Sequence, residues 1–255
     1  NTDRIAGLGY QAAIGDVREA ISVQRGIEGC DGVVHLAGLS SWNDINSPLM
    51  DEVVVTGSRN VLTAAQGAGN VRMVFVSTAA AINGSTSAVV FNEDSDCTLD
   101  LRKYRYSRAK RSVEAACRTA ADAGLPVSIV NPTEVYGPND TALITAGNLI
   151  DIAKSTPVLV CRGGTSVVHV EDVAEGTILA LERGIAGERY ILGGDNLTIA
   201  ELAHLTLDIL GKRKPVLQLP NALVRGAGKT ARALQLPLPV DPNVIPYATL
   251  FWLMD

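Results

Sequence analysis

Short apolar runs alternate with longer amphipathic segments through the first half of the chain. The apolar runs have strand length and are mostly rich in β-branched residues, and they cover residues 12–15, 33–37, 71–77 and 127–131. The longer segments repeat Val, Leu and Ala every three or four residues, which predicts helices over 17–28, 51–68 and 106–121. This alternation predicts a parallel α/β sheet whose strands are covered on both faces.

The alternation is looser after residue 138. We expect helices over 141–153, 170–182 and 199–210, and strands over 157–160, 165–168 and 189–192. Six prolines lie between residues 212 and 246, so this stretch cannot form one long helix. The second half therefore predicts a smaller and less regular lobe.

Composition narrows the possible partners. The 255 residues are 47% hydrophobic, 19% charged and carry a net charge of −5, which is typical of a globular protein and not of a nucleic-acid-binding one. The longest apolar runs fall short of 18 residues, so we expect no membrane partner. Four scattered cysteines without C-x-x-C spacing predict no metal site and favour a reducing compartment, the cytoplasm.

Tyr106 and Lys110 stand four residues apart and so share one face of the predicted helix. A tyrosine with a pKa of about 10 must lose roughly 3 units, about 4 kcal/mol, to act as a base near neutrality. A cation about 4 Å away can supply a similar amount, so we expect Lys110 to lower the pKa of Tyr106. Tyr104 suits this role less well because Arg108 follows it at the same spacing.

Small hydroxyl side chains follow the strand predicted over residues 71–77. Ser77 and Thr78 would lie at its carboxyl end, which is where open α/β sheets bind their ligands. A hydroxyl group there can hydrogen-bond a substrate oxygen while a tyrosine moves the proton.

Six short motifs extend this pattern. In chain order they are Gly15-Asp16-Val17, His35-Leu36-Ala37-Gly38, Val76-Ser77-Thr78-Ala79, Tyr106-x-x-x-Lys110, the stretch from Asn131-Pro132-Thr133 to Gly137-Pro138, and the stretch from Val168-His169 to Val173-Ala174. With them the chain resembles the extended short-chain dehydrogenases/reductases, the NAD-dependent epimerase/dehydratase family. Within that family it is most similar to the dihydroflavonol-reductase-like and hopanoid-associated epimerase-like branch.

The resemblance implies a role for each matched residue. Tyr106 would donate or accept the proton, Lys110 would hold the nicotinamide ribose, and Thr78, with Ser77 beside it, would bind the reacting oxygen. The cofactor-binding residues that it implies are Asp16 and Val17 at the adenine, Ala37 and Gly38 at the ribose and phosphates, Lys110, and Pro132 and Thr133 at the nicotinamide. His35 and His169 would serve packing and hydrogen bonding.

The same resemblance implies a Rossmann-like doubly wound parallel sheet with a smaller C-terminal substrate lobe. We expect the dinucleotide-binding domain to comprise 1–138 with 165–184, and the lobe to comprise 139–164 with 185–255. No glycine-rich turn precedes residue 12, so the first βαβ unit is expected to be missing, and both ends look incomplete. The choice between NAD and NADP therefore stays open.

The function expected from the resemblance is NAD(P)-dependent oxidation, reduction or epimerisation of a small molecule, either a carbonyl compound or a nucleotide sugar. An apolar substrate site could be lined by Leu217, Leu219, Leu223 and Val224. A sugar nucleotide would instead need an arginine at its pyrophosphate, and the candidates are Arg162, Arg189 and Arg225. We expect all three arginines to be solvated surface residues. Val54 stands where relatives commonly place Asn, which leaves a non-catalytic dinucleotide-sensing or interaction module as an alternative. Relatives often dimerise through the two helices predicted over 51–68 and 106–121, so a homodimer is expected.

Overall fold

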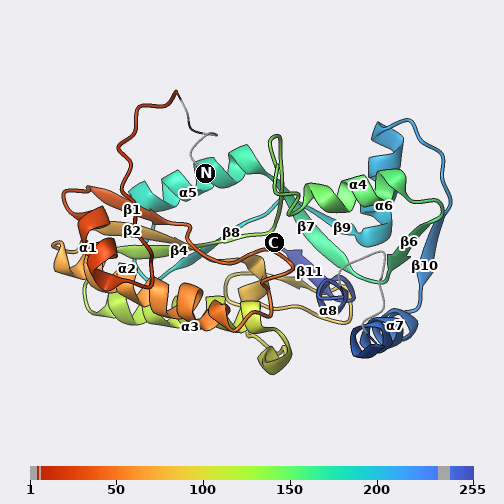
Figure 1. Ribbon diagram of the computed structural model, residues 1–255, viewed down its shortest axis with the longest axis horizontal. Helices are drawn as coiled ribbons and strands as arrows, with labels where there is room; N and C mark the ends of the chain where they lie inside the picture. The colour runs from red at the N-terminus through yellow and green to blue at the C-terminus, as the bar shows by residue number, and fades with distance from the viewer. Residues whose placement is uncertain (1–4, 6, 235–241) are drawn as a thin grey trace.

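The computed structural model describes residues 5, 7–234 and 242–255, and its central sheet contains four parallel strands. Their order is β1 (Gly32–His35), β2 (Arg72–Val76), β4 (Val127–Pro132) and β8 (Arg189–Leu192) (Figure 1). Because every pair is parallel, the carboxyl ends of all four strands lie along the same edge of the sheet. The expected Rossmann-like parallel sheet is confirmed.

Helices cover both faces of this sheet. On one face α1 (Ala20–Ile27), α2 (Gly57–Gly67) and α3 (Arg105–Asp122) enclose a core that includes Phe75 and Ile129. On the other face α5 (Val170–Arg183) packs Ala180 against Val74 and Val130, which point the opposite way from Phe75 and Ile129 along the same strands. Burial on both faces accounts for the nearly continuous apolar runs of β2 and β4.

The prediction of a strand over residues 12–15 is wrong. Residues 9–16 form no strand, and the Ile14 side chain is fully exposed. A β-strand needs a hydrogen-bonded neighbour, and in the described part of the chain the sheet ends at β1 with no further strand beside it. The helix that follows also begins later than expected, at Ala20.

A second sheet lies beside the first. It contains β3 (Val90–Phe91), β11 (Phe251–Met254), β7 (Gly164–His169) and β5 (Glu134–Tyr136) in parallel order, with β9 (Asp195–Thr198) antiparallel to β7. A separate ribbon of β6 (Val158–Cys161) and β10 (Val216–Leu219) packs on α4 (Ala146–Lys154) and α6 (Ile199–Ile209). The chain then continues through α7 (Asn221–Leu234) and α8 (Ile245–Ala248).

Two segments belong to sheets that differ from the expected division. The segment at 189–192 was assigned to the smaller lobe, but it is β8 and pairs with β4 in the central sheet. The segment at 165–168 was assigned to the dinucleotide-binding domain, but it lies in β7 of the second sheet. The proline-rich stretch contains β10, α7 and the start of α8, as its prolines require, and residues 235–241 within it lie outside the described part of the chain.

The described helices include none with both the length and the apolar character needed to cross a lipid bilayer.

Candidate active site

Three neighbouring strands bring predicted site residues to one edge of the central sheet. Ala37 and Gly38 follow β1, and Ser77 and Thr78 follow β2. Pro132 is the last residue of β4, and Thr133 follows it. The first two turns of α3, which carry Tyr106 and Lys110, pack at the same edge. These residues were expected to act together, and the fold places them together.

Tyr106 and Thr78 are neighbours. The Thr78 side chain lies near the Tyr106 phenol, and its hydroxyl lowers the pKa of the phenol. Burial has the larger effect and raises the pKa of Tyr106 above its usual value of 10.0. The expected lowering of the pKa by Lys110 is therefore wrong, because burial outweighs every interaction that favours the phenolate.

The Lys110 ammonium is held at the end of β2. Its Nζ donates a hydrogen bond to the main-chain oxygen of Val76 over 2.8 Å and lies 4.9 Å from the centre of the Phe75 ring. Only 5% of the residue is exposed, and burial lowers the pKa of Lys110 to about 8, although Glu114 acts in the opposite direction.

The surroundings of Lys110 fit a ribose. Within the described part of the chain, Val76 supplies the one hydrogen-bond acceptor of Nζ, so two ammonium donors are left for ligand hydroxyls. Gly38 lies over the same group, since a Cβ there would sit 3.6 Å from Nζ. A glycine at this position keeps the path to the ammonium open, which suits the cofactor role that the sequence implied for both residues.

Ser77 is turned away from the position expected for it. Its hydroxyl donates to Glu114 Oε1 at 2.5 Å, its main-chain N–H donates to Val130, and only 5% of the residue is exposed. The structure therefore places Ser77 in the buried layer below Thr78 and joins it to α3.

Glu114, which is not among the residues predicted for the site, is the centre of a buried polar network. Its carboxylate is fully buried and accepts hydrogen bonds from Ser77, from Asn131 Nδ2 at 2.7 Å and from Arg189 at 3.5 Å. The Asn131 amide also donates to the main-chain oxygen of Thr78 at 2.9 Å. Glu114 thus connects α3 to the ends of β2 and β4 directly beneath the candidate site.

One signal for Glu114 was present in the sequence. It follows Lys110 by four residues, so a charged side chain occupies the buried face of an otherwise apolar helix pattern. Arg189 was expected to be a solvated surface residue, which is wrong. Its side chain is 9% exposed and pairs with Glu114, because β8 adds to the central sheet next to β4.

The two histidines take the packing roles that were expected. His35 is 4% exposed, and its Nε2 lies 2.8 Å from the Ser58 hydroxyl. His169 precedes α5 and accepts a hydrogen bond from the main-chain N–H of Glu171.

The residues expected at the adenine lie near the start of α2. The Val17 main-chain oxygen accepts a hydrogen bond from Asn60 at 2.9 Å, and a Cβ on Gly57 would touch the Val17 side chain. The Asp16 carboxylate pairs with Arg18, which lowers its pKa to about 2. Asp16 is therefore ionised and partly engaged before any ligand arrives.

At the other side of the edge, Thr133 is tied to β8. Its main-chain N–H and its hydroxyl both point to the oxygen of Leu192, at 3.1 and 3.4 Å, and Pro132 is buried in register with the same leucine. The expected nicotinamide-flanking pair is held in place by the sheet.

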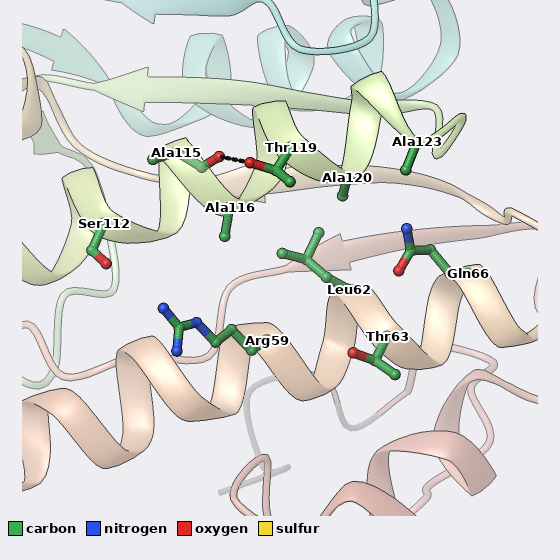
Figure 2. A pocket seen from close by; sticks show the side chains of 10 residues that line it. All are labelled: Arg59, Leu62, Thr63, Gln66, Ser112, Ala115, Ala116, Thr119, Ala120 and Ala123. Atoms are coloured by element: carbon green, nitrogen blue, oxygen red, sulfur yellow. Dashed lines mark hydrogen bonds between the residues drawn. The ribbon is translucent and has the colours of Figure 1, made fainter.

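A groove of about 600 Å³ lies outside this edge, between α2 and α3. Figure 2 shows small side chains of α3, among them Ala116 and Ala120, facing Arg59 and Leu62 of α2. None of the predicted catalytic or cofactor-binding residues lines it, so its size alone does not make it the active site.

Comparisons with known proteins agree with this arrangement. The model of the NAD dependent epimerase/dehydratase family matches residues 1–193. The chain is 30% identical over 221 residues to sterol demethylase protein B of Methylococcus capsulatus, a match that covers 86% of this chain and 67% of that protein. It is also 30% identical over 250 residues to a putative dihydroflavonol 4-reductase of Synechocystis, covering 95% and 72%.

Solved structures show the same fold. The crystal structure of gox2253 has a TM-score of 0.79 at 26% identity, and the match covers 100% of this chain and 79% of that one. DesIV, a dTDP-glucose 4,6-dehydratase from Streptomyces venezuelae solved with NAD and TYD, has a TM-score of 0.73 at 27% identity and covers 86% and 71%. The expectation of an enzyme that uses NAD or NADP agrees with these findings, and the chain belongs to the NAD-dependent epimerase/dehydratase family.

Proposed function

We propose that this chain is an NAD(P)-dependent oxidoreductase that acts on an apolar carbonyl compound or the corresponding alcohol. The observation that carries the proposal is the meeting of the Tyr106 phenol with the Thr78 side chain, beside the buried Lys110 ammonium, at the carboxyl edge of the sheet. Thr78 would hydrogen-bond the substrate oxygen, and Tyr106 would give it a proton in reduction or take one in oxidation. The nicotinamide, when bound, supplies or accepts the hydride.

The remaining residues of the edge would orient the two reactants. Two free donors of Lys110 would hold ribose hydroxyls, and the lack of a side chain at Gly38 would let the ribose approach them. Pro132 and Thr133, fixed against β8, would limit the position of the nicotinamide ring. Asp16 and Val17 would lie at the adenine end.

An aromatic cluster beside the phenol supports an apolar substrate. Tyr106 packs at the margin of a cluster formed by Trp42, Tyr104, Tyr247 and Trp252, whose ring centres lie 5.2–6.2 Å apart where they meet. The leucines expected to line the substrate site lie on the smaller lobe. Leu217 and Leu223 are 48% and 60% exposed on β10 and α7.

A nucleotide sugar is the less favoured substrate. Its pyrophosphate would require an arginine. Of the three arginines named from the sequence, Arg189 is buried against Glu114 and Arg225 donates to Thr249 at 2.8 Å, which leaves the exposed Arg162 for this role. Some relatives act on apolar carbonyl compounds by their names, for example a ceramide reductase of Caulobacter vibrioides at 27% identity.

Activity with a substrate panel tests this proposal. NADH and NADPH would each be offered with apolar ketones, aldehydes and nucleotide sugars, and we expect consumption of one cofactor with an apolar carbonyl compound. Cofactor binding without turnover over the whole panel would instead support the dinucleotide-sensing alternative, which Val54 motivates because its buried side chain cannot relay a proton.

We also propose that two copies associate through the groove between α2 and α3 (Figure 2). The small side chains of α3 allow another helix to approach closely, and Ala116→Arg would block that approach. Light scattering is expected to give a dimer for the wild type and a monomer for this variant.

We further propose a cytoplasmic location, which the four free cysteines support.

A further inference from the structure

One end of the smaller lobe has a charge unlike that of the rest of the molecule. Residues 209–234 hold six of the 22 basic residues and none of the 27 acidic ones, although the whole chain carries a net charge of −5. The six basic residues are Lys212, Arg213, Lys214, Arg225, Lys229 and Arg232. The stretch spans the loop after α6, strand β10 and helix α7.

Two of these cations have no partner in the described part of the chain. Lys212 and Lys214 donate to the main-chain oxygen of Ala153 at the end of α4, and Arg225 is held by Thr249. Arg213 and Lys229 are exposed, and no described acidic side chain forms an ion pair with either. Their charges are therefore presented to the solvent.

Exposed leucines lie between these two cations. Leu159 of β6 and Leu217 of β10 are paired in register on the face of the ribbon opposite Val158 and Val160, and they are 55% and 48% exposed. The chain passes from β10 through a single proline into α7, where Leu223 is 60% exposed. Exposed leucines thus occur both on the ribbon and on the helix that follows it.

Figure 1 shows how these parts are arranged. The loop after α6, strand β10 and helix α7 follow one another along one end of the molecule, and α1 and β1 lie at the opposite end. Along the chain, Arg213 precedes Leu217 and Leu223, and Lys229 follows them. Large apolar side chains flanked by cations are what the interface of an anionic bilayer attracts.

We propose that this end of the molecule binds peripherally to the surface of an anionic lipid bilayer. Leu159, Leu217 and Leu223 would enter the boundary between head groups and acyl chains, and Arg213 and Lys229 would pair with lipid phosphates. The proposal replaces the sequence expectation of no membrane partner, and it requires no spanning helix. A nucleic acid fits less well, because its binding rests on phosphate contacts and makes no use of the exposed leucines.

Vesicle co-sedimentation tests the proposal with the whole chain. Vesicles of phosphatidylglycerol and phosphatidylcholine are expected to bind the protein, whereas pure phosphatidylcholine vesicles bind little, and salt should weaken the binding. Arg213→Glu with Lys229→Glu is expected to reduce partitioning more than about tenfold, because each cation at an anionic surface contributes about 1 kcal/mol. Leu223→Asp is expected to reduce it by a similar factor.

The matched control reverses two charges at the far end of the molecule. Arg25 and Arg183 are exposed on α1 and α5, and Arg25→Glu with Arg183→Glu should change binding by no more than about twofold. If circular dichroism shows that a Glu variant has lost its fold, the Gln variants at 213 and 229 replace it. The proposal is overturned by three results: no binding to anionic vesicles, an equal loss in the control variant, or full binding by Leu223→Asp together with competition by heparin, which would indicate a general polyanion site.

Discussion

Lys110 donates a hydrogen bond from Nζ to the main-chain oxygen of Val76, 2.8 Å away, and this contact holds its charge at the end of β2. The lysine is thus placed to bind ligand hydroxyls, while the phenol keeps a raised pKa that Thr78 partly offsets. Burial of the ammonium has a consequence for stability that can be measured without any substrate.

Stability should depend on the ionisation of Lys110 in alkaline solution. Its pKa is about 8 in the folded chain, whereas an unperturbed lysine has a pKa of 10.5, so between these values the unfolded chain binds the extra proton. The free energy of unfolding should therefore rise with pH across this window, by on the order of 3 kcal/mol from this group. Urea unfolding of wild type and Lys110→Met at several pH values measures the difference, and curves that stay parallel from pH 8 to 10.5 would contradict the assignment.

The free energy of unfolding should also depend on the ionisation of His35 in acidic solution. Burial, with a smaller contribution from Lys110, lowers the pKa of His35 from 6.5 to about 4, so only the unfolded chain takes up a proton between these values. Acidification through this window should cost roughly 3 kcal/mol of stability. His35→Gln should remove most of that loss. His204→Gln, an exposed histidine on α6, should leave it unchanged, and equal slopes for wild type and His35→Gln would refute the prediction.

The Glu114 network should be important for stability. Glu114→Ala leaves the donors of Ser77 and Asn131 without their acceptor and Arg189 without its counter-charge inside the protein. Removing one partner of a buried ion pair costs about 3–5 kcal/mol, so the variant should unfold at much lower urea. Glu175→Ala, on the exposed side of α5, should change stability by less than about 0.5 kcal/mol. A Glu114→Ala protein as stable as this control would show that the network contributes little.

Thr78 should affect both rate and pH dependence. Thr78→Val keeps the shape of the side chain but removes the hydroxyl that lowers the pKa of Tyr106. We expect kcat/KM to fall by roughly a hundredfold and the alkaline limb of the oxidation rate to move to higher pH. Thr230→Val, at an exposed position on α7, is the matched control. A pH profile identical to that of the wild type would separate Thr78 from the phenol.

The local sequence was sufficient for the elements that carry the core. The strands at β1, β2 and β4 and the helices α3, α5 and α6 lie within a few residues of their expected positions, because burial on one or both faces leaves a clear hydrophobic period. Motif order was likewise sufficient to bring Tyr106, Thr78 and Lys110 together.

Other features depend on contacts that no local pattern encodes. Residues 12–15 have strand-like composition but lack a neighbour to pair with. The short strands β3 and β11 are defined by pairing with segments far away in the sequence, β3 with β11 and β11 also with β7. The direction of Lys110 was missed because a buried carbonyl, that of Val76, competes for its ammonium. Arg189 was misjudged because only the pairing of β8 with β4 shows that it is buried.

The turnover of Tyr106→Phe tests the central claim most directly. The substitution removes one hydroxyl and keeps the ring, and Tyr104→Phe makes the same change two residues earlier as a control. With the best substrate of the panel, we expect Tyr106→Phe to lower kcat by a factor of roughly 10²–10⁴ while NAD(H) or NADP(H) affinity stays within about threefold. Tyr104→Phe should retain most of the activity. Turnover of Tyr106→Phe at the wild-type rate would contradict the account, because the phenol would then not be the group that moves the proton.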